Sequence, residues 1–150
     1  MLKFPKPEKA PKGRRKGAKT SKHRKARKAS MALCDRLFSR LVRTEGFCEG
    51  KGYVNPDGTI TGCSAVLQCA HIVSRRYKAV RWSGANAVCL CSAHHIFFTY
   101  RPIEWRIFVN ARFAKGYMEL QEEHALQVAK PDYDAIAAFL REKLGEKVAA

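Results

Sequence analysis

Two short apolar runs, separated by a basic and polar segment, dominate the hydrophobic pattern in the middle of the chain. The first, residues 67–71, reads LQCAH, and the second, residues 87–90, reads AVCL. Short apolar runs that are bounded by turn residues are typical of buried strands. We therefore expect a strand that ends at His71, a loop, a returning strand, and then a helix that carries His95.

A helix is predicted before these strands, over residues 30–44. Apolar residues recur there at helical spacing, while arginines occupy the other faces. Thr20, Ser21 or Ser30 could cap this helix, and the basic segment before Ser30 could extend it. Gly46 is expected to end it.

Helices are also predicted over the C-terminal part of the chain. One begins at Pro102, a second covers residues 115–129, and a third covers residues 133–144 and ends at Gly145. In the second of these we expect three apolar side chains to face the core: Leu120, Leu126 and Val128. We expect the C-terminal helices to be scaffold without chemistry of their own.

Charge divides the chain unevenly. The net charge of the 150 residues is +16, and residues 1–30 hold 13 Lys or Arg against one acid. Residues 1–29 have almost nothing apolar to bury, so we expect a disordered basic tail followed by one domain over residues 30–145. The tail is either a solubilising or localising segment or, as we favour, an arm that neutralises the phosphates of nucleic acid.

The order of His71, Asn86 and His95 in LQCAHIVSRRYKAVRW and NAVCLCSAHHIFFTYRPIEWRIFV resembles the HNH endonuclease motif. The resemblance is to small HNH proteins common in bacteriophages, and it covers roughly residues 31–145. It implies an α+β fold with a ββα-metal core. That core motif would cover residues 63–100, with an N-terminal helix before it, a zinc knuckle, and a helical part over residues 101–145.

The chemistry of phosphodiester hydrolysis agrees with these residue types. The reaction needs a base to activate water and a cation beside the scissile phosphate. In the HNH resemblance His71 is the general base, Asn86 braces the loop that holds it, and His95 ligates a divalent metal such as Mg²⁺ or Mn²⁺. Ala70 and Ser83 depart from the family pattern, which often has an acid or histidine before the base and an aspartate in the loop. Asn86, water and substrate phosphate would then complete the metal shell.

A second, structural metal site is predicted from cysteine spacing. Cys91 and His94 are separated by two residues, which is the spacing of a zinc knuckle. The HNH resemblance supplies the other half near Cys48, with Cys63 joining it across an inserted hairpin at residues 55–58. The alternatives are that Cys91 and His94 are packing residues, or that Cys69 replaces Cys63. We interpret the two remaining cysteines as core residues: Cys34 and Cys89.

The loop between the two strands is basic and aromatic. In HNH proteins this loop faces the nucleic acid, so the resemblance implies that its cations contact phosphate: Arg75, Arg76, Lys78 and Arg81. The alternative is an exposed basic loop in which Trp82 anchors the core, and for Trp82 we favour that alternative.

The sequence thus predicts a metal-dependent endonuclease that nicks or cleaves DNA, with a structural Zn²⁺. The alternatives are a non-catalytic, zinc-stapled nucleic-acid-binding module, a structure-selective nuclease that needs a phage packaging or recombination partner, and an RNA-associated basic protein. The basic start is followed by no apolar segment, and no apolar run is long enough to span a membrane. We therefore expect a cytoplasmic protein, in a bacterial host cell if a phage encodes it, and the sequence does not predict its oligomeric state.

Overall fold

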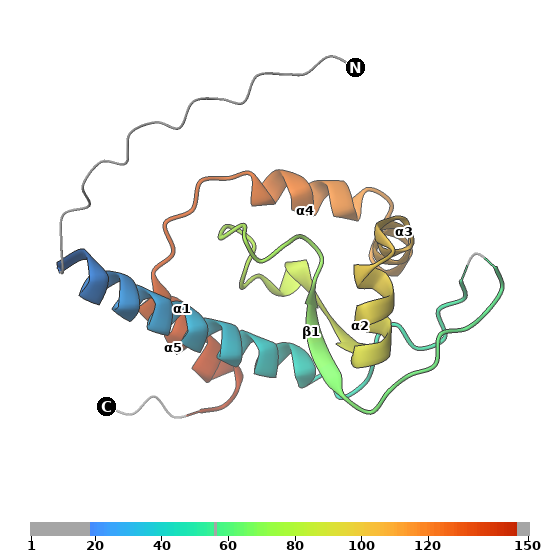
Figure 1. Cartoon of the computed structure of the whole chain (residues 1–150), viewed down its shortest axis with the longest axis horizontal. Coiled ribbons are helices and arrows are strands. Elements are labelled where there is room, and N and C mark those ends of the chain that lie inside the picture. The colour runs from blue at the N-terminus through green and yellow to red at the C-terminus, as the bar shows by residue number, and fades with distance from the viewer. Residues whose placement is uncertain (1–18, 56, 147–150) are drawn as a thin grey trace, which may run out of the picture.

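The computed structural model describes residues 19–55 and 57–146, and these form a mixed α+β fold (Figure 1). Five α-helices surround a sheet of two strands, and a short 3-10 helix precedes the second strand. In chain order the elements are α1 (Lys19–Arg43), β1 (Leu67–His71), η1 (Gly84–Asn86), β2 (Ala87–Cys91), α2 (Ser92–Thr99), α3 (Pro102–Arg112), α4 (Tyr117–Ala125) and α5 (Tyr133–Lys143).

The central sheet is antiparallel and passes directly into α2. Leu67 pairs with Cys91 at one end, and His71 pairs with Ala87 at the other. The predicted strand ending at His71, the returning strand and the helix carrying His95 are all confirmed. Every residue of β2 is buried, which explains why its sequence is continuously apolar instead of alternating.

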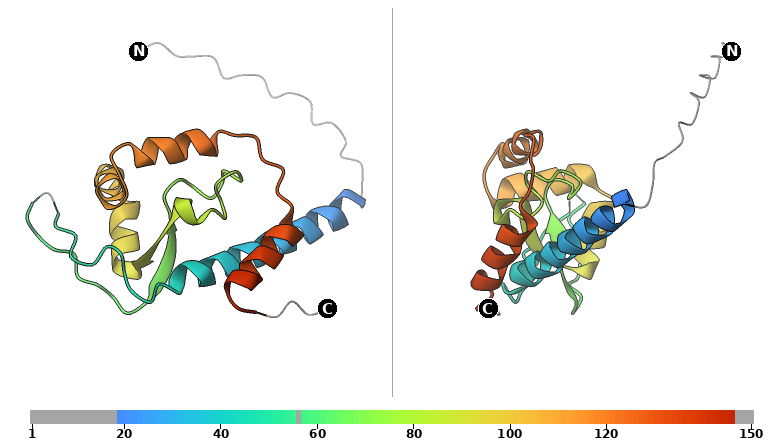
Figure 2. Two further views of the ribbon diagram at one scale, coloured as in Figure 1. Left: turned by 180° about the vertical axis from the view of Figure 1, so that it is seen from behind. Right: turned by 90° about the vertical axis from the view of Figure 1, so that its left-hand side faces the viewer.

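Helices cover both faces of this sheet (Figures 1 and 2). α1 contacts both strands and packs along α5, whereas α2 contacts both strands and then α3. Because side chains alternate along a strand, Ala70, Val88 and Leu90 join the core on the α2 side. Ala87 instead joins the core formed by α1 and α5.

α1 begins earlier than the helix predicted for residues 30–44. It starts at Lys19, so the boundary that we drew after residue 29 is wrong for residues 19–29, and the rest of the expected tail lies outside the described residues. The segment is rich in Lys, Arg and Ala, which are good helix formers, and it contains no Gly or Pro. This first part of α1 projects past α5 (Figure 2).

The C-terminal helices begin near their predicted positions, but the buried face of α4 was predicted wrongly. Leu120 is 44% exposed, Leu126 76% and Val128 95%. The buried positions are Gln121 and Ala125, which lie four residues apart on one helical face. α4 also ends before Leu126, so two of the expected core residues are outside the helix.

No helix within residues 19–55 and 57–146 is both long and apolar enough to cross a membrane.

Candidate metal centre and adjoining histidine cavity

Four side chains that are distant in sequence converge at the N-terminus of α2. Cys48 follows the turn that ends α1, Cys63 follows a small hairpin, and Cys91 and His94 lie at the cap and in the first turn of α2. The hairpin is held by an isolated bridge between Val54 and Ile60. The ligand atoms of the four residues all lie within 4.8 Å of one another, so this group could hold a metal ion such as zinc.

The donor set suits tetrahedral zinc, and two of the three distances from His94 match the spacing of such a site, while the third is shorter. Bonds of about 2.3 Å to sulfur and 2.0 Å to nitrogen place neighbouring donors of a tetrahedral ion roughly 3.5–3.8 Å apart. The Nδ1 atom of His94 lies 3.6 Å from the Sγ of Cys48, 3.7 Å from that of Cys63 and 3.1 Å from that of Cys91. Three thiols and one imidazole form a closed set of the kind found in structural zinc sites.

Backbone groups prepare the cluster for a cation. The Sγ of Cys48 accepts a hydrogen bond from the backbone N–H of Cys91 at 3.1 Å. Burial raises the pKa of the Cys91 thiol, but hydrogen bonds from His94 and Ser64 outweigh it and lower that pKa below its usual value. Burial raises the pKa of Cys48, so its thiolate needs a nearby positive charge.

The imidazole of His94 is locked in place by its neighbours. The side chain is fully buried, and its Nε2 atom has no hydrogen-bond partner among the described residues. Nδ1 is the nitrogen that faces the three sulfurs, so it is the one placed to bind a metal with them. Gly50 lies against the ring, because a Cβ built there would be 3.0 Å from Cδ2 of His94 and 3.1 Å from Cγ.

All six cysteines are free thiols, as expected for residues that serve as metal ligands or core. Cys34 and Cys89 are fully buried, which confirms their interpretation as core residues. Cys69 is half-buried on β1 and lines a cavity away from the cluster, so it does not replace Cys63.

The second site is a cavity of about 350 Å³ beside the end of β1. His71 and His95 both line it, and both also line an adjoining cavity of about 200 Å³. The larger cavity lies between α1 and the loop after β1. Its remaining lining residues are Asp35, Phe38, Ser39, Cys69, Ser74 and Arg75.

His71 is held with one nitrogen available to the cavity. Its Nε2 lies 2.9 Å from the backbone carbonyl oxygen of Arg81. Because a carbonyl only accepts, Nε2 carries the proton and Nδ1 keeps a free lone pair. Burial lowers the pKa of His71 below its ordinary value, and the charges of Arg75 and Arg81 act in the same direction.

The imidazole of His95, on α2, has one hydrogen-bond partner in the part of the chain that the structure describes. Its Nδ1 lies 2.5 Å from the side-chain oxygen of Gln68, which leaves Nε2 available. In the described part of the chain, the Cys48, Cys63, Cys91 and His94 group is the one set of three or more Cys, His, Asp or Glu that could hold a metal, and His95 is not in it. Ala70 is buried in the core and contributes no ligand.

Asn86 fastens the two ends of the loop that follows β1. Its Oδ1 accepts from the backbone N–H of Val73 at 2.7 Å, and its Nδ2 donates to the carbonyls of Val73 and Val80 at 3.0 and 3.1 Å. The side chain is fully buried, bonds the backbone through both Oδ1 and Nδ2, and lines neither of the two cavities, so Asn86 is not placed to complete a metal shell as the sequence had suggested.

The cations of the loop fall into two groups. Arg75 and Arg76 are exposed, and Arg75 borders the cavity, while Lys78 is half-buried. Arg81 points inward instead: its side chain is 12% exposed and pairs with Asp35 at 2.7 Å. The predicted phosphate contact of Arg81 does not fit this arrangement, because its guanidinium is hydrogen-bonded to Asp35 and to the backbone carbonyl of Arg75.

Three residues of these sites were missed by sequence reasoning. They are Asp35, which pairs with Arg81, Gln68, which bonds His95, and Gly50, which packs on His94. Asp35 carried a usable signal, because it is the one acidic residue in the strongly basic sequence of α1. Gln68 and Gly50 carried none, since their roles depend on side chains that are distant in sequence.

Comparison with models of protein families, with curated proteins and with solved structures finds no match to this chain. The fold and sites therefore define a mixed α+β protein with a Cys₃His cluster suited to a metal such as zinc.

Proposed function

We propose that this protein is a metal-dependent endonuclease of the HNH type that hydrolyses DNA phosphodiester bonds. The observation that carries the proposal is the convergence of His71 and His95 on the same two cavities, beside an exposed arginine. Neither histidine belongs to the Cys₃His cluster, so both remain available for chemistry.

His71 is the general base. Its Nδ1 lone pair is free, because Nε2 donates to the carbonyl of Arg81. Burial favours the neutral imidazole, so the side chain can accept a proton from water near neutral pH. Asn86 supports this role indirectly, since it bonds the backbone of Val73 and of Val80, the residue before Arg81.

His95 would hold a divalent cation such as Mg²⁺ or Mn²⁺ through Nε2, with Gln68 orienting the ring. When bound, such a cation offsets negative charge on the scissile phosphate and its leaving oxygen. A single histidine ligand leaves most of the shell to water and phosphate oxygens. We therefore expect weak cation binding by the free protein and tighter binding with DNA present.

The exposed cations lie where a polyanion would be bound. Arg75 lines the larger cavity and its neighbour Arg76 is exposed, and the solvent-exposed first part of α1 carries a run of cations: Lys22, Arg24, Lys25, Arg27 and Lys28. Lys28 precedes the cavity residue Asp35 by seven positions, or about 10 Å along a helix. Such a surface binds phosphates without reading sequence.

The test is cleavage of supercoiled plasmid by the full chain. Zinc-loaded wild type, His71→Ala and His124→Ala would be compared with Mg²⁺, with Mn²⁺ and with no added cation. His124 is exposed on α4 and serves as the matched histidine control. Omitting the cation is preferable to adding a strong chelator, because a chelator would also strip zinc from the Cys₃His cluster.

Nicked or linear product that requires a cation and His71, but not His124, is the expected result. His71→Ala should lower the cleavage rate by on the order of 10²–10⁴-fold while leaving plasmid binding intact. Plasmid that is bound but never cut would overturn the proposal.

A bound but uncut plasmid would favour a zinc-stapled nucleic-acid-binding module. The specific observation behind this second candidate is that Ala70 is buried in the core and that, among the residues the structure describes, His95 belongs to no group of metal-binding side chains. Cleavage of branched DNA alone would instead indicate a structure-selective nuclease of the kind that works with packaging or recombination partners.

A further inference from the structure

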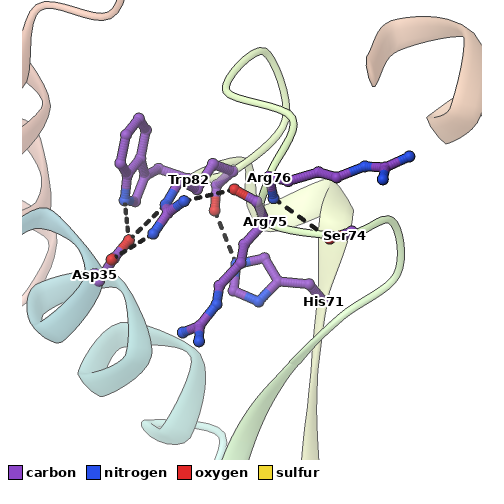
Figure 3. Close-up of polar contacts among 7 residues, drawn as sticks. Asp35, His71, Ser74, Arg75, Arg76 and Trp82 are labelled. Carbon is purple, nitrogen blue, oxygen red and sulfur yellow. Dashed lines mark hydrogen bonds and ion pairs between the residues drawn. The ribbon is translucent and has the colours of Figure 1, made fainter. Parts of the chain in front are cut away.

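Asp35 of α1 is the meeting point of three hydrogen bonds from the loop between β1 and β2 (Figure 3). Its Oδ1 accepts from Nε of Arg81 at 2.8 Å and from Nε1 of Trp82 at 3.0 Å. Its Oδ2 accepts from Nη2 of Arg81 at 2.7 Å. A forked pair of this kind fixes the orientation of the arginine as well as its position.

The same arginine reaches both the loop and the histidine. Its Nη1 donates to the backbone carbonyl of Arg75 at 2.6 Å, so one guanidinium joins α1 to the start of the loop. Its own backbone carbonyl accepts the hydrogen bond from Nε2 of His71 at 2.9 Å. Asp35 thus holds the residue whose carbonyl selects the protonated nitrogen of His71.

Two simpler roles for Asp35 do not account for this arrangement. Asp35 also borders the cavity, but both of its carboxylate oxygens are used by nitrogen donors, which leaves little capacity for a metal. A surface ion pair that served stability alone would not need a third donor from Trp82 or a connection to the histidine. Burial raises the pKa of Asp35, but hydrogen bonds from Arg81 and Trp82 outweigh it and lower that pKa, so the carboxylate stays charged.

We propose that Asp35 is a positioning residue that acts through Arg81 to hold His71 in its Nε2–H tautomer with Nδ1 directed to the cavity. The importance of this tautomer rests on the proposed function, in which Nδ1 of His71 is the base. Asp35 need not touch substrate or metal. Its effect is to keep the Arg81 carbonyl where His71 can donate to it.

The first test reads the tautomer directly and does not depend on activity. Long-range ¹H–¹⁵N spectra of the zinc-loaded, ¹⁵N-histidine-labelled chain distinguish protonated from unprotonated ring nitrogens. The chain has five histidines, so the His71 signals would be assigned by their loss in His71→Ala. Wild type should show His71 as the Nε2–H form alone, and Asp35→Asn should show a mixture of the two tautomers.

The second test is kinetic. Because a base displaced by about 1 Å can cost on the order of 100-fold in rate, Asp35→Asn should lower kcat by 10- to 100-fold and change KM less than 3-fold. Arg81→Lys keeps the positive charge but cannot form the fork, and it should behave like Asp35→Asn. Glu119→Gln is the matched control, since it removes the carboxylate from an exposed pair with Arg106 and should leave both constants unchanged.

The outcomes separate this inference from the proposed function. A folded Asp35→Asn protein in which His71 keeps a single Nε2–H tautomer would overturn the positioning role, whatever the wild type cleaves. Wild type that cuts no substrate, while Asp35→Asn still mixes the tautomers, would overturn the endonuclease and leave the positioning of His71 intact. If neither Asp35→Asn nor Arg81→Lys folds, the pair serves stability and the inference fails.

Discussion

Two consecutive histidines of α2 belong to sites of opposite design. His94 is fully buried, and its Nδ1 faces three thiols that complete a tetrahedral donor set. His95 is half-buried and lines a cavity, and its ring is hydrogen-bonded to Gln68. Successive residues of a helix point about 100° apart, so one turn can serve two sites. Closed ligand sets are typical of structural metals, and open ones leave positions for substrate and water.

Replacing each histidine with alanine tests most directly whether His94 and His95 serve separate sites. His94→Ala should lose zinc and about 4 kcal/mol of unfolding free energy, if zinc is present at a thousand times its Kd. His95→Ala should keep its zinc and its melting temperature but cleave plasmid at least about 100-fold more slowly, because several kcal/mol of charge stabilisation are lost. Zinc content, thermal melting and plasmid cleavage would be measured on both variants.

The two variants act as controls for each other. Loss of zinc from His95→Ala to the same extent as from His94→Ala would mean that the two sites are not independent. Full cleavage by His95→Ala would remove that residue from the proposed reaction.

A substitution at Gly50 should affect the Cys₃His cluster alone, and its effect should be smaller than that of His94→Ala. An added Cβ would lie 3.0 Å from Cδ2 of His94, and the ring cannot retreat because its Nδ1 is held among the sulfurs. Gly50→Ala should therefore lower the free energy of unfolding by about 1–3 kcal/mol, the usual cost of overpacking. Urea unfolding of the zinc-loaded protein would measure it. Gly62→Ala is the matched control, because nothing lies within 4 Å of a Cβ there.

If Gly50→Ala melts like Gly62→Ala, the ring of His94 has room to move and is less firmly held than we infer. The cleavage rate should be the same in both glycine variants, since neither residue borders the cavity of His71 and His95.

The Cys₃His cluster could be predicted from sequence more fully than the cavity of His71 and His95. Its four ligands, Cys48, Cys63, Cys91 and His94, are the four that knuckle spacing and family resemblance had suggested. Three of the six cysteines are not in the cluster, so residue type alone was not enough, and the two-residue spacing of Cys91 and His94 supplied the rest of the signal.

The electrostatics of the loop were less predictable. An arginine in a basic loop is expected to face solvent, yet Arg81 turns inward because Asp35, 46 positions earlier, offers it a carboxylate. Similarly, the side-chain amide of Asn86 is hydrogen-bonded to backbone groups of the loop itself. Composition shows which donors exist, but only the packing of α1 against the sheet determines which acceptor each one meets.

The secondary structure was also predictable only in part. The strands and α2 were predicted correctly, since continuous apolar runs leave little choice. α4 was misjudged because its buried face includes Gln121 while Leu126 lies beyond its end. Its pattern was therefore too weak to fix which face is buried, and contacts with α3 decided it.

The pH dependence of stability should differ only slightly between wild type and a His71 variant. The difference shows whether His71 lies in a cavity or on a solvated surface. Burial lowers the pKa of His71 relative to its unfolded value of about 6.5. Below pH 6.5 the unfolded chain therefore takes up a proton that the folded chain refuses. The stability contributed by neutral His71 is present above pH 6.5 and is lost as pH falls. His71→Gln cannot titrate, so it lacks this contribution to the pH dependence.

Between pH 7.5 and 5.5, wild type should therefore lose more unfolding free energy than His71→Gln, as measured by urea unfolding of the zinc-loaded proteins. Protonation of the cluster thiols destabilises both proteins equally and cancels in the difference. For the same reason, the acid limb of the cleavage profile should have its midpoint below pH 6.5. A midpoint at or above pH 6.5, with equal pH dependence of stability in the two proteins, would mean that His71 is solvated and that the cavity does not hold it neutral.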